Sequence, residues 1–80
     1  MNSMLVCTAS MASQTYALKA QKALSGAAIP SRVVRLDGAK SKKGCSFGVE
    51  FPCGQKRNVE NVLSSARIRV KHYYQGDVEI

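Results

Sequence analysis

Three cysteines, Cys7, Cys45 and Cys53, are the residues of this 80-residue chain with the clearest capacity for chemistry. An odd number at irregular spacings leaves at least one thiol outside any set of intramolecular disulfides. There is no CxxC pair, and His72 is the only histidine, so the four ligands of a structural zinc site are missing. We therefore expect no metal and no cofactor, and free thiols in a reducing cytoplasm.

Cys45 is the thiol whose neighbours in the sequence most favour reactivity. Lys42 and Lys43 precede it, and nearby positive charge lowers the pKa of a thiol and so increases the fraction of nucleophilic thiolate. Gly44 and Gly48 leave the backbone around it uncrowded, which would permit close approach by a partner. The alternative is that Cys45 is a small core residue at the head of a strand, as free cysteines often are.

The other two cysteines receive weaker assignments. Cys7, near the end of the first predicted strand, is the candidate for a second thiol close to Cys45, with an inert buried cysteine as the alternative. Cys53 follows Cys45 by about eight extended residues, on the order of 26 Å at the rise of a strand, so these two cannot form a disulfide while the strand is intact. We expect Cys53 to be an exposed thiol in a turn.

Patterns of apolar residues predict the elements that would position these cysteines. Helical spacing covers residues 13–24 and recurs at Val59, Val62 and Leu63. Strand patterns cover residues 4–8, 31–36, 45–51 and 68–74. The order β-α-β-β-α-β predicts an α+β, ferredoxin-like sandwich with a four-stranded antiparallel sheet and two helices on one face.

The length predicts a single domain over residues 1–80, with a core from about residue 4 to 74 and a frayed tail at 75–80. In this topology the first and third strands are central and antiparallel. The start of the third strand then lies beside the end of the first and the beginning of the first helix. Cys45 would therefore lie near a helix N-terminus, which stabilises a thiolate. The predicted core residues are Leu24, Phe47, Val49, Phe51, Val62 and Leu63.

The charge of the chain indicates anionic partners. Twelve Lys and Arg against 5 Asp and Glu give a net charge of +7, which attracts acidic surfaces over long range. Lys40, Lys42 and Lys43 lie in a predicted loop that either binds a phosphate or an acidic protein surface or is simply solvated. No apolar run approaches the roughly 18 residues of a membrane helix, and no secretory segment is present, which predicts a cytoplasmic protein.

A second cationic pattern, Arg67, Arg69 and Lys71 beside Tyr73, is of the kind that an RNA-binding sheet would need. The aromatic RNP signatures are missing, however, and the exposed positions 46, 48 and 50 of the third strand carry no ring. Nucleic-acid binding is therefore disfavoured. His72 has no carboxylate nearby in the sequence, and we assign it no role.

The segments TYALKA at 15–20, GAAIP at 26–30 and GCSFGV at 44–49 resemble the selenium/sulfur carrier-like family, small bacterial proteins long classed as a domain of unknown function. The resemblance extends from the first predicted strand to the fourth. It implies that a cysteine holds a persulfide or selenopersulfide and passes it to a partner protein. Cys45 takes this role by position, and many relatives have glycine directly after the cysteine where this chain has serine. The residues expected around the thiol are Lys42, Lys43, Gly44, Ser46 and Gly48.

Two functions from different classes stay open on the sequence. One is a thiol carrier, a non-enzymatic shuttle or enzyme accessory that uses Cys45 and has sulfur or selenium donor and acceptor proteins as partners. The other is a small basic binding or protein-interaction module in which Cys45 only packs. The sequence does not distinguish sulfur from selenium, and it does not determine the oligomeric state.

Overall fold

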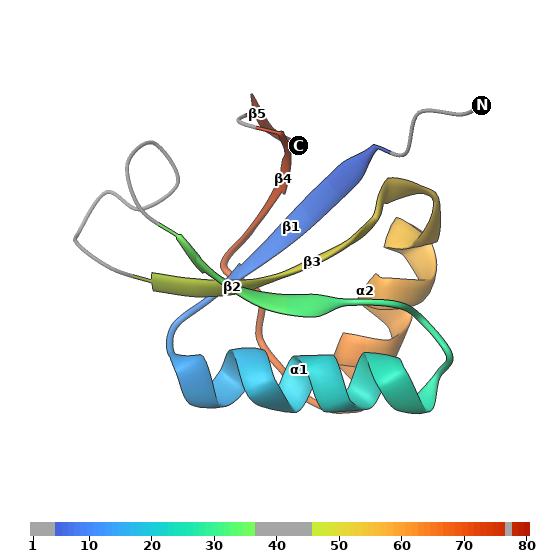
Figure 1. Cartoon of the computed structure of the whole chain (residues 1–80). Helices are drawn as coiled ribbons and strands as arrows, with labels where there is room; N and C mark the ends of the chain where they lie inside the picture. Colours follow the sequence, from blue (N-terminus) through green and yellow to red (C-terminus); the bar gives the residue numbers. More distant parts are fainter. Residues whose placement is uncertain (1–4, 37–45, 77) are drawn as a thin grey trace.

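The computed structural model describes residues 5–36, 46–76 and 78–80 (Figure 1). Its elements are strand β1 (Val6–Met11), helix α1 (Gln14–Gly26), strands β2 (Arg32–Leu36) and β3 (Ser46–Pro52), the short 3-10 helix η2 (Cys53–Gln55), helix α2 (Lys56–Ser65), and strands β4 (His72–Gln75) and β5 (Val78–Glu79). Both helices cover the same side of the sheet. In the described part of the chain, neither helix is long and apolar enough to cross a bilayer.

The strands form one antiparallel sheet in the order β2-β3-β1-β4-β5. This confirms the predicted α+β class, with two helices and an antiparallel sheet in which β1 pairs with both β3 and β4. The sheet has five strands, however, and the sequence predicts four. The tail that was expected to fray forms β5, because Gly76 has a φ of 62° and the chain reverses there, placing Val78 opposite Gln75.

Helix α1 begins and ends where local chemistry predicts. The Ser13 side chain accepts a hydrogen bond from the Tyr16 amide at 3.3 Å, which caps the N-terminus. The helix ends at Gly26, but Ala28 is the residue that adopts the left-handed conformation, with a φ of 62°. The Ile29 amide then bonds back to the Leu24 carbonyl at 2.9 Å, so Ile29 turns into the core.

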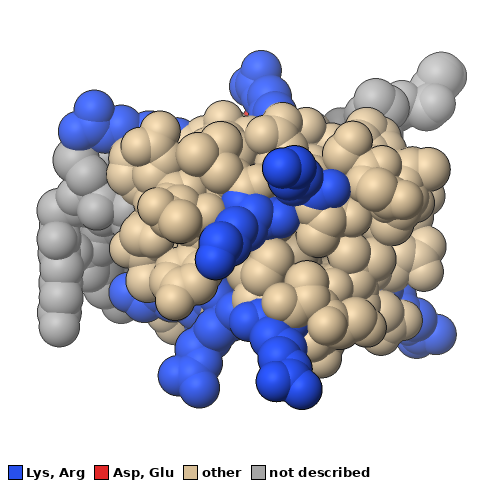
Figure 2. Space-filling view, turned by 90° about the horizontal axis from the view of Figure 1, so that it is seen from below, with Lys and Arg blue, Asp and Glu red and all other residues tan. Residues whose placement is uncertain are grey.

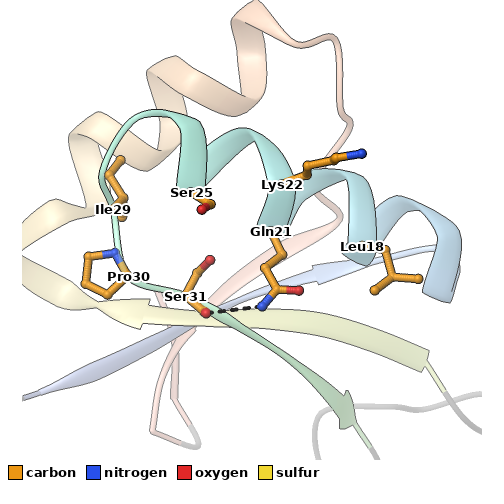
Figure 3. A pocket seen from close by; sticks show the side chains of 7 residues that line it. All are labelled: Leu18, Gln21, Lys22, Ser25, Ile29, Pro30 and Ser31. Atoms are coloured by element: carbon orange, nitrogen blue, oxygen red, sulfur yellow. Dashed lines mark hydrogen bonds between the residues drawn. The ribbon is translucent and has the colours of Figure 1, made fainter.

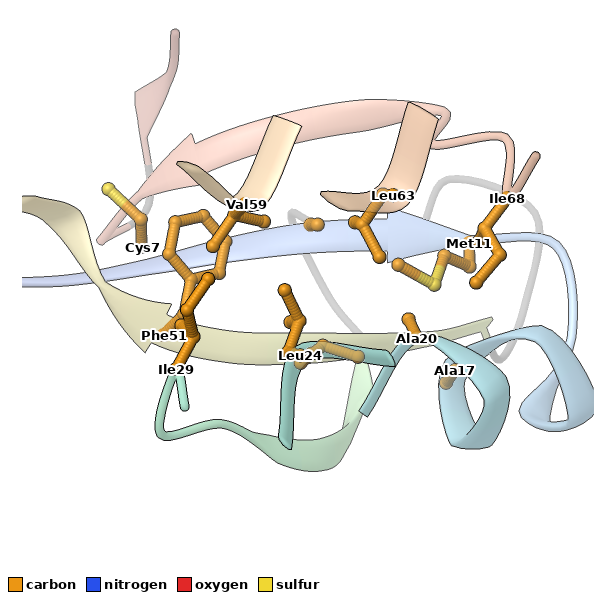
Figure 4. Packing of buried hydrophobic residues seen from close by; sticks show 12 residues of the cluster. Cys7, Met11, Ala17, Ala20, Leu24, Ile29, Phe51, Val59, Leu63 and Ile68 are labelled. Atoms are coloured by element: carbon orange, nitrogen blue, oxygen red, sulfur yellow. The ribbon is translucent and has the colours of Figure 1, made fainter. Parts of the chain in front are cut away.

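The apolar core lies between the sheet and the two helices (Figure 4). Four of the predicted core residues are buried as expected: Leu24, Val49, Phe51 and Leu63. The other two, Phe47 and Val62, are half-buried and pack against the same cluster. The sequence patterns therefore identified the correct faces of β3, α1 and α2.

Tyr73 closes the edge of this core beside α2. The Tyr73 ring meets the Phe51 ring edge-on, with the two ring centroids 6.3 Å apart. The Lys56 Nζ lies 4.8 Å from the centroid of the Tyr73 ring. Burial, and secondarily the charge of Glu60, raise the pKa of Tyr73 to about 12. The phenol is therefore neutral at physiological pH and can pack as an apolar ring that holds β4 to α2.

Gly48 lies in the middle of β3, where the neighbouring strand leaves no space for a side chain. A Cβ atom there would lie 2.6 Å from the Ala9 carbonyl oxygen, 3.1 Å from Leu36 Cδ1 and 3.2 Å from Thr8 Cγ2. The carbonyl oxygen belongs to the backbone of β1 and cannot move away without disturbing the central strand pair. Close packing of the sheet therefore requires glycine at this position.

We predict that Gly48→Ala lowers the free energy of unfolding by about 1–3 kcal/mol, as for other overpacked core sites. Gly54→Ala is the matched control, because nothing lies within 4 Å of the Cβ that it would add. That variant should stay within about 0.5 kcal/mol of the parent in urea denaturation. Equal losses in the two variants would show that the crowding at Gly48 is not what demands glycine.

Candidate functional site

The end of the sheet where β1 finishes is called here the Met11 end. Four other elements, β2, β3, β4 and α1, each have one end there. Strand β3 starts there, with Phe47 opposite Met11, and β2 finishes there, with Leu36 opposite Ser46. Strand β4 starts at the same end, and Ser13, two residues after Met11, caps α1. The predicted arrangement, with the start of the third strand beside the end of the first and the beginning of the first helix, is confirmed.

The residue that follows the predicted carrier cysteine lies at the Met11 end. Cys45 itself, with Lys40, Lys42, Lys43 and Gly44, lies outside the described residues. Its successor Ser46 opens β3, one residue before the pairing with β1. The start of β3 therefore lies about one strand spacing, roughly 5 Å, from the segment of β1 that leads into α1.

Both signs of charge are described around the Met11 end: the Glu79 carboxylate pairs with His72 at the start of β4, and the other charged side chains there are cationic. Lys71 is tied to β1 through its amide, which donates to the Ser10 carbonyl at 2.8 Å, and Arg69 lies two residues earlier. The first turn of α1 contains no acidic residue, so the partial positive charge of its N-terminus is not neutralised there. Arg35, opposite Phe47, adds a third cation to this end of the sheet.

Cys7 and Cys53 form a disulfide, with their Cα atoms 4.9 Å apart. This corrects the expectation of free thiols at both positions and of an exposed turn thiol at Cys53. The strand register explains the bond: Cys7 is opposite Phe51, so the chain leaving β3 passes beside β1. The Cys53 amide also donates to the Leu5 carbonyl at 3.0 Å. The sequence-based interpretation rested on the spacing between Cys53 and Cys45, and that spacing could not reveal Cys7 as the partner.

The disulfide lies at the end of the sheet opposite the Met11 end. Ser46 is about 17 Å along β3 from Phe51, at the usual rise of about 3.3 Å per residue. In this structure, Cys7 is therefore not a free thiol, and it lies at the other end of β3 from Ser46. Because the other two cysteines are bonded to each other, the chain contains no further cysteine that could pair with Cys45.

Gly48 and His72 also differ from their sequence-based interpretations. Gly48 is buried, and the space beside it is filled by Ala9, Leu36 and Thr8, so it does not provide an open approach for a partner. His72 does have a carboxylate partner, since Glu79 in β5 brings its Oε2 to 2.7 Å from the His72 Nδ1. That pair depends on the fifth strand, which the sequence did not predict.

The sheet face opposite the helices does not form a platform for stacking bases. Tyr74 is the aromatic residue that β4 presents on that face, and it is only 8% exposed. Tyr73 packs on Phe51, on the helix side of the sheet. Among the described residues, no group of His, Cys, Asp or Glu could hold a metal ion.

A family model described as Putative Se/S carrier protein-like matches residues 7–75. The chain belongs to this family. The match runs from Cys7 in β1 to Gln75 in β4 and includes Cys45, so it covers the resemblance that the sequence motifs indicated. No curated protein and no solved structure was found to match the chain.

We predict that breaking the Cys7–Cys53 bond, which joins residues 46 apart in sequence, lowers the free energy of unfolding by about 4 kcal/mol through the closed loop it releases. Urea denaturation of the protein before and after treatment with dithiothreitol measures this difference. The Cys45→Ser variant keeps the bond and should lose the same amount on reduction. Unchanged stability after reduction would contradict a stabilising role for the disulfide.

Proposed function

We propose that this protein is a sulfur or selenium carrier that holds a persulfide or selenopersulfide on Cys45 and delivers it to an acceptor protein. Membership of the Se/S carrier protein-like family over residues 7–75 is the observation that carries the proposal, because the matched region includes this cysteine. Two features of the described residues support it.

The first supporting feature is the position of Ser46, the residue that follows Cys45. Ser46 starts β3 close to the N-terminus of α1, whose first turn carries no acidic residue. Unpaired amides at a helix N-terminus and nearby cations lower the pKa of a thiol, and only the thiolate attacks sulfur. Arg69 and Lys71 add positive charge at the same end.

The second supporting feature is that neither of the other two cysteines is a free thiol. A thiol that attacked a persulfide on Cys45 would form a disulfide and release the outer sulfur prematurely. Cys7 and Cys53 are bonded to each other at the opposite end of β3. A sulfur loaded on Cys45 is therefore protected from internal attack.

The proposed transfer consists of two displacement steps. The Cys45 thiolate attacks the outer sulfur of a donor persulfide, a bond forms between them, and the donor thiolate leaves with the electron pair. A nucleophile on the acceptor then attacks that outer sulfur, and Cys45 leaves as thiolate. No oxidation or reduction beyond this exchange is needed, and the same steps apply to selenium.

We predict that Cys45 reacts with iodoacetamide below the pH expected of an ordinary thiol, with half-maximal reactivity below about pH 8.5. The unreduced protein suits this measurement, because the Cys7–Cys53 bond protects the other two thiols. Cys45→Ser is the control and should not be labelled. Incubation with glutathione persulfide should add one sulfur atom to the parent protein and none to this variant.

Two results would contradict the carrier function. Labelling that rises only above about pH 8.5 would indicate an unperturbed thiol. Labelling that requires unfolding would indicate a cysteine that only packs, as expected of the alternative, a basic interaction module. Replacing Lys42 and Lys43 by alanine should shift the labelling profile to higher pH if their charges assist the thiolate.

A further inference from the structure

A shallow groove lies between the C-terminal half of α1 and the segment that leads into β2 (Figure 3). We call it the α1 groove. It is lined by Leu18, Gln21, Lys22, Ser25, Ile29, Pro30 and Ser31. The Gln21 Nε2 donates to the Ser31 carbonyl at 3.4 Å and joins the two walls. The Gln21–Ser31 bond and the turn that ends α1 fix the shape of the groove. This shape does not depend on the residues around Cys45.

The apolar part of the groove is open to solvent at one side. Leu18 is 51% exposed on the helix wall, while Ile29 is 5% exposed and forms part of the core beneath. Tyr16, 45% exposed, lies on the same helix two residues before Leu18. An aliphatic side chain from another protein could therefore cover Leu18 and remove it from water, which favours binding.

Two polar groups of the groove have no partner among the described residues. The Ser31 hydroxyl is buried without a hydrogen-bond partner, and its side chain points toward α1 in Figure 3. A small rotation of this side chain would direct the hydroxyl to an oxygen atom held in the groove, which would satisfy it. Lys22, on the helix wall, has no ion pair with any described carboxylate.

The surroundings of the groove are also cationic. Glu60 and Glu79 are paired away from the groove, with Lys56 and His72, and Glu50 is paired with Arg32, the residue that follows Ser31. Figure 2 shows the molecule from the helix side, where Lys and Arg side chains stand out and almost no acidic atoms are visible. This face therefore attracts negative charge.

We infer that the α1 groove docks a partner protein through a segment that presents a carboxylate beside an aliphatic side chain. The carboxylate pairs with Lys22, and the aliphatic side chain packs on Leu18 and Ile29. A protein fits better than a nucleic acid, because protein interfaces combine an apolar centre with charged surroundings, whereas single strands bind along rows of cations and stacking rings. This inference goes beyond the carrier function and does not require a reactive Cys45.

The test uses the full oxidised chain and a short synthetic peptide in which glutamates flank a single leucine. In a nuclear magnetic resonance titration, the amide shifts should concentrate in residues 18–31. Lys22→Glu should weaken binding about tenfold, as for loss of a close charge pair. Arg57→Glu on α2 changes the net charge equally and should weaken it less than about twofold, because exposed charges away from a contact are screened by salt.

Further arms separate the contributions and the possible occupants. Replacing the leucine of the peptide by serine should also weaken binding about tenfold, which corresponds to the burial of one such side chain. Equal losses in Lys22→Glu and Arg57→Glu would overturn the inference by showing attraction to overall charge only. Tighter binding of oligouridylate than of the peptide, or peptide shifts outside residues 18–31, would overturn it as well.

Discussion

The antiparallel pairing of β1 with β3 is the constraint on which the other features of this protein depend. These two strands occupy the centre of the sheet, and their register places Met11 opposite Phe47 and Cys7 opposite Phe51. One end of the pair therefore holds the attachment point of Cys45, and the other holds the Cys7–Cys53 disulfide. A shift of one residue would turn the buried residues of β3 to the opposite face. It would also move Gly48 away from the crowded position beside Ala9 where only glycine fits.

The two ends of this strand pair have different chemical roles in the proposed carrier. The disulfide joins β1 to the start of η2 and closes a long loop, which stabilises the sheet and the entry into α2. The Met11 end gathers a helix N-terminus and cations, the conditions that favour a thiolate. Because the two lie at opposite ends of β3, the stabilising bond and the proposed reactive thiol need not interfere with each other.

The described acidic side chains lie away from the outer face of α1. The three described glutamates are used in ion pairs on β2–β3, on α2 and on β4–β5. Such exposed pairs contribute little to stability, but they leave the outer face of α1 without acidic residues. A partner that docks on this face would hold the protein by α1, whose N-terminus lies at the Met11 end. The proposed groove and the proposed thiol are thus compatible on one molecule.

Much of the fold could be predicted from the sequence, because its determinants act between residues that are close along the chain. The helical spacing of α1, the alternation in β3 and the apolar stripe of α2 all belong to this class. The motifs that indicated the family are local as well, and the family match confirmed that resemblance. What the sequence could not supply depended on the register between distant strands. Cys53 meets Cys7 because β3 runs antiparallel to β1, and Glu79 meets His72 because a two-residue strand folds back on β4. Spacing along the chain does not encode such meetings, since they arise only when the whole sheet has formed and each backbone group has found its partner.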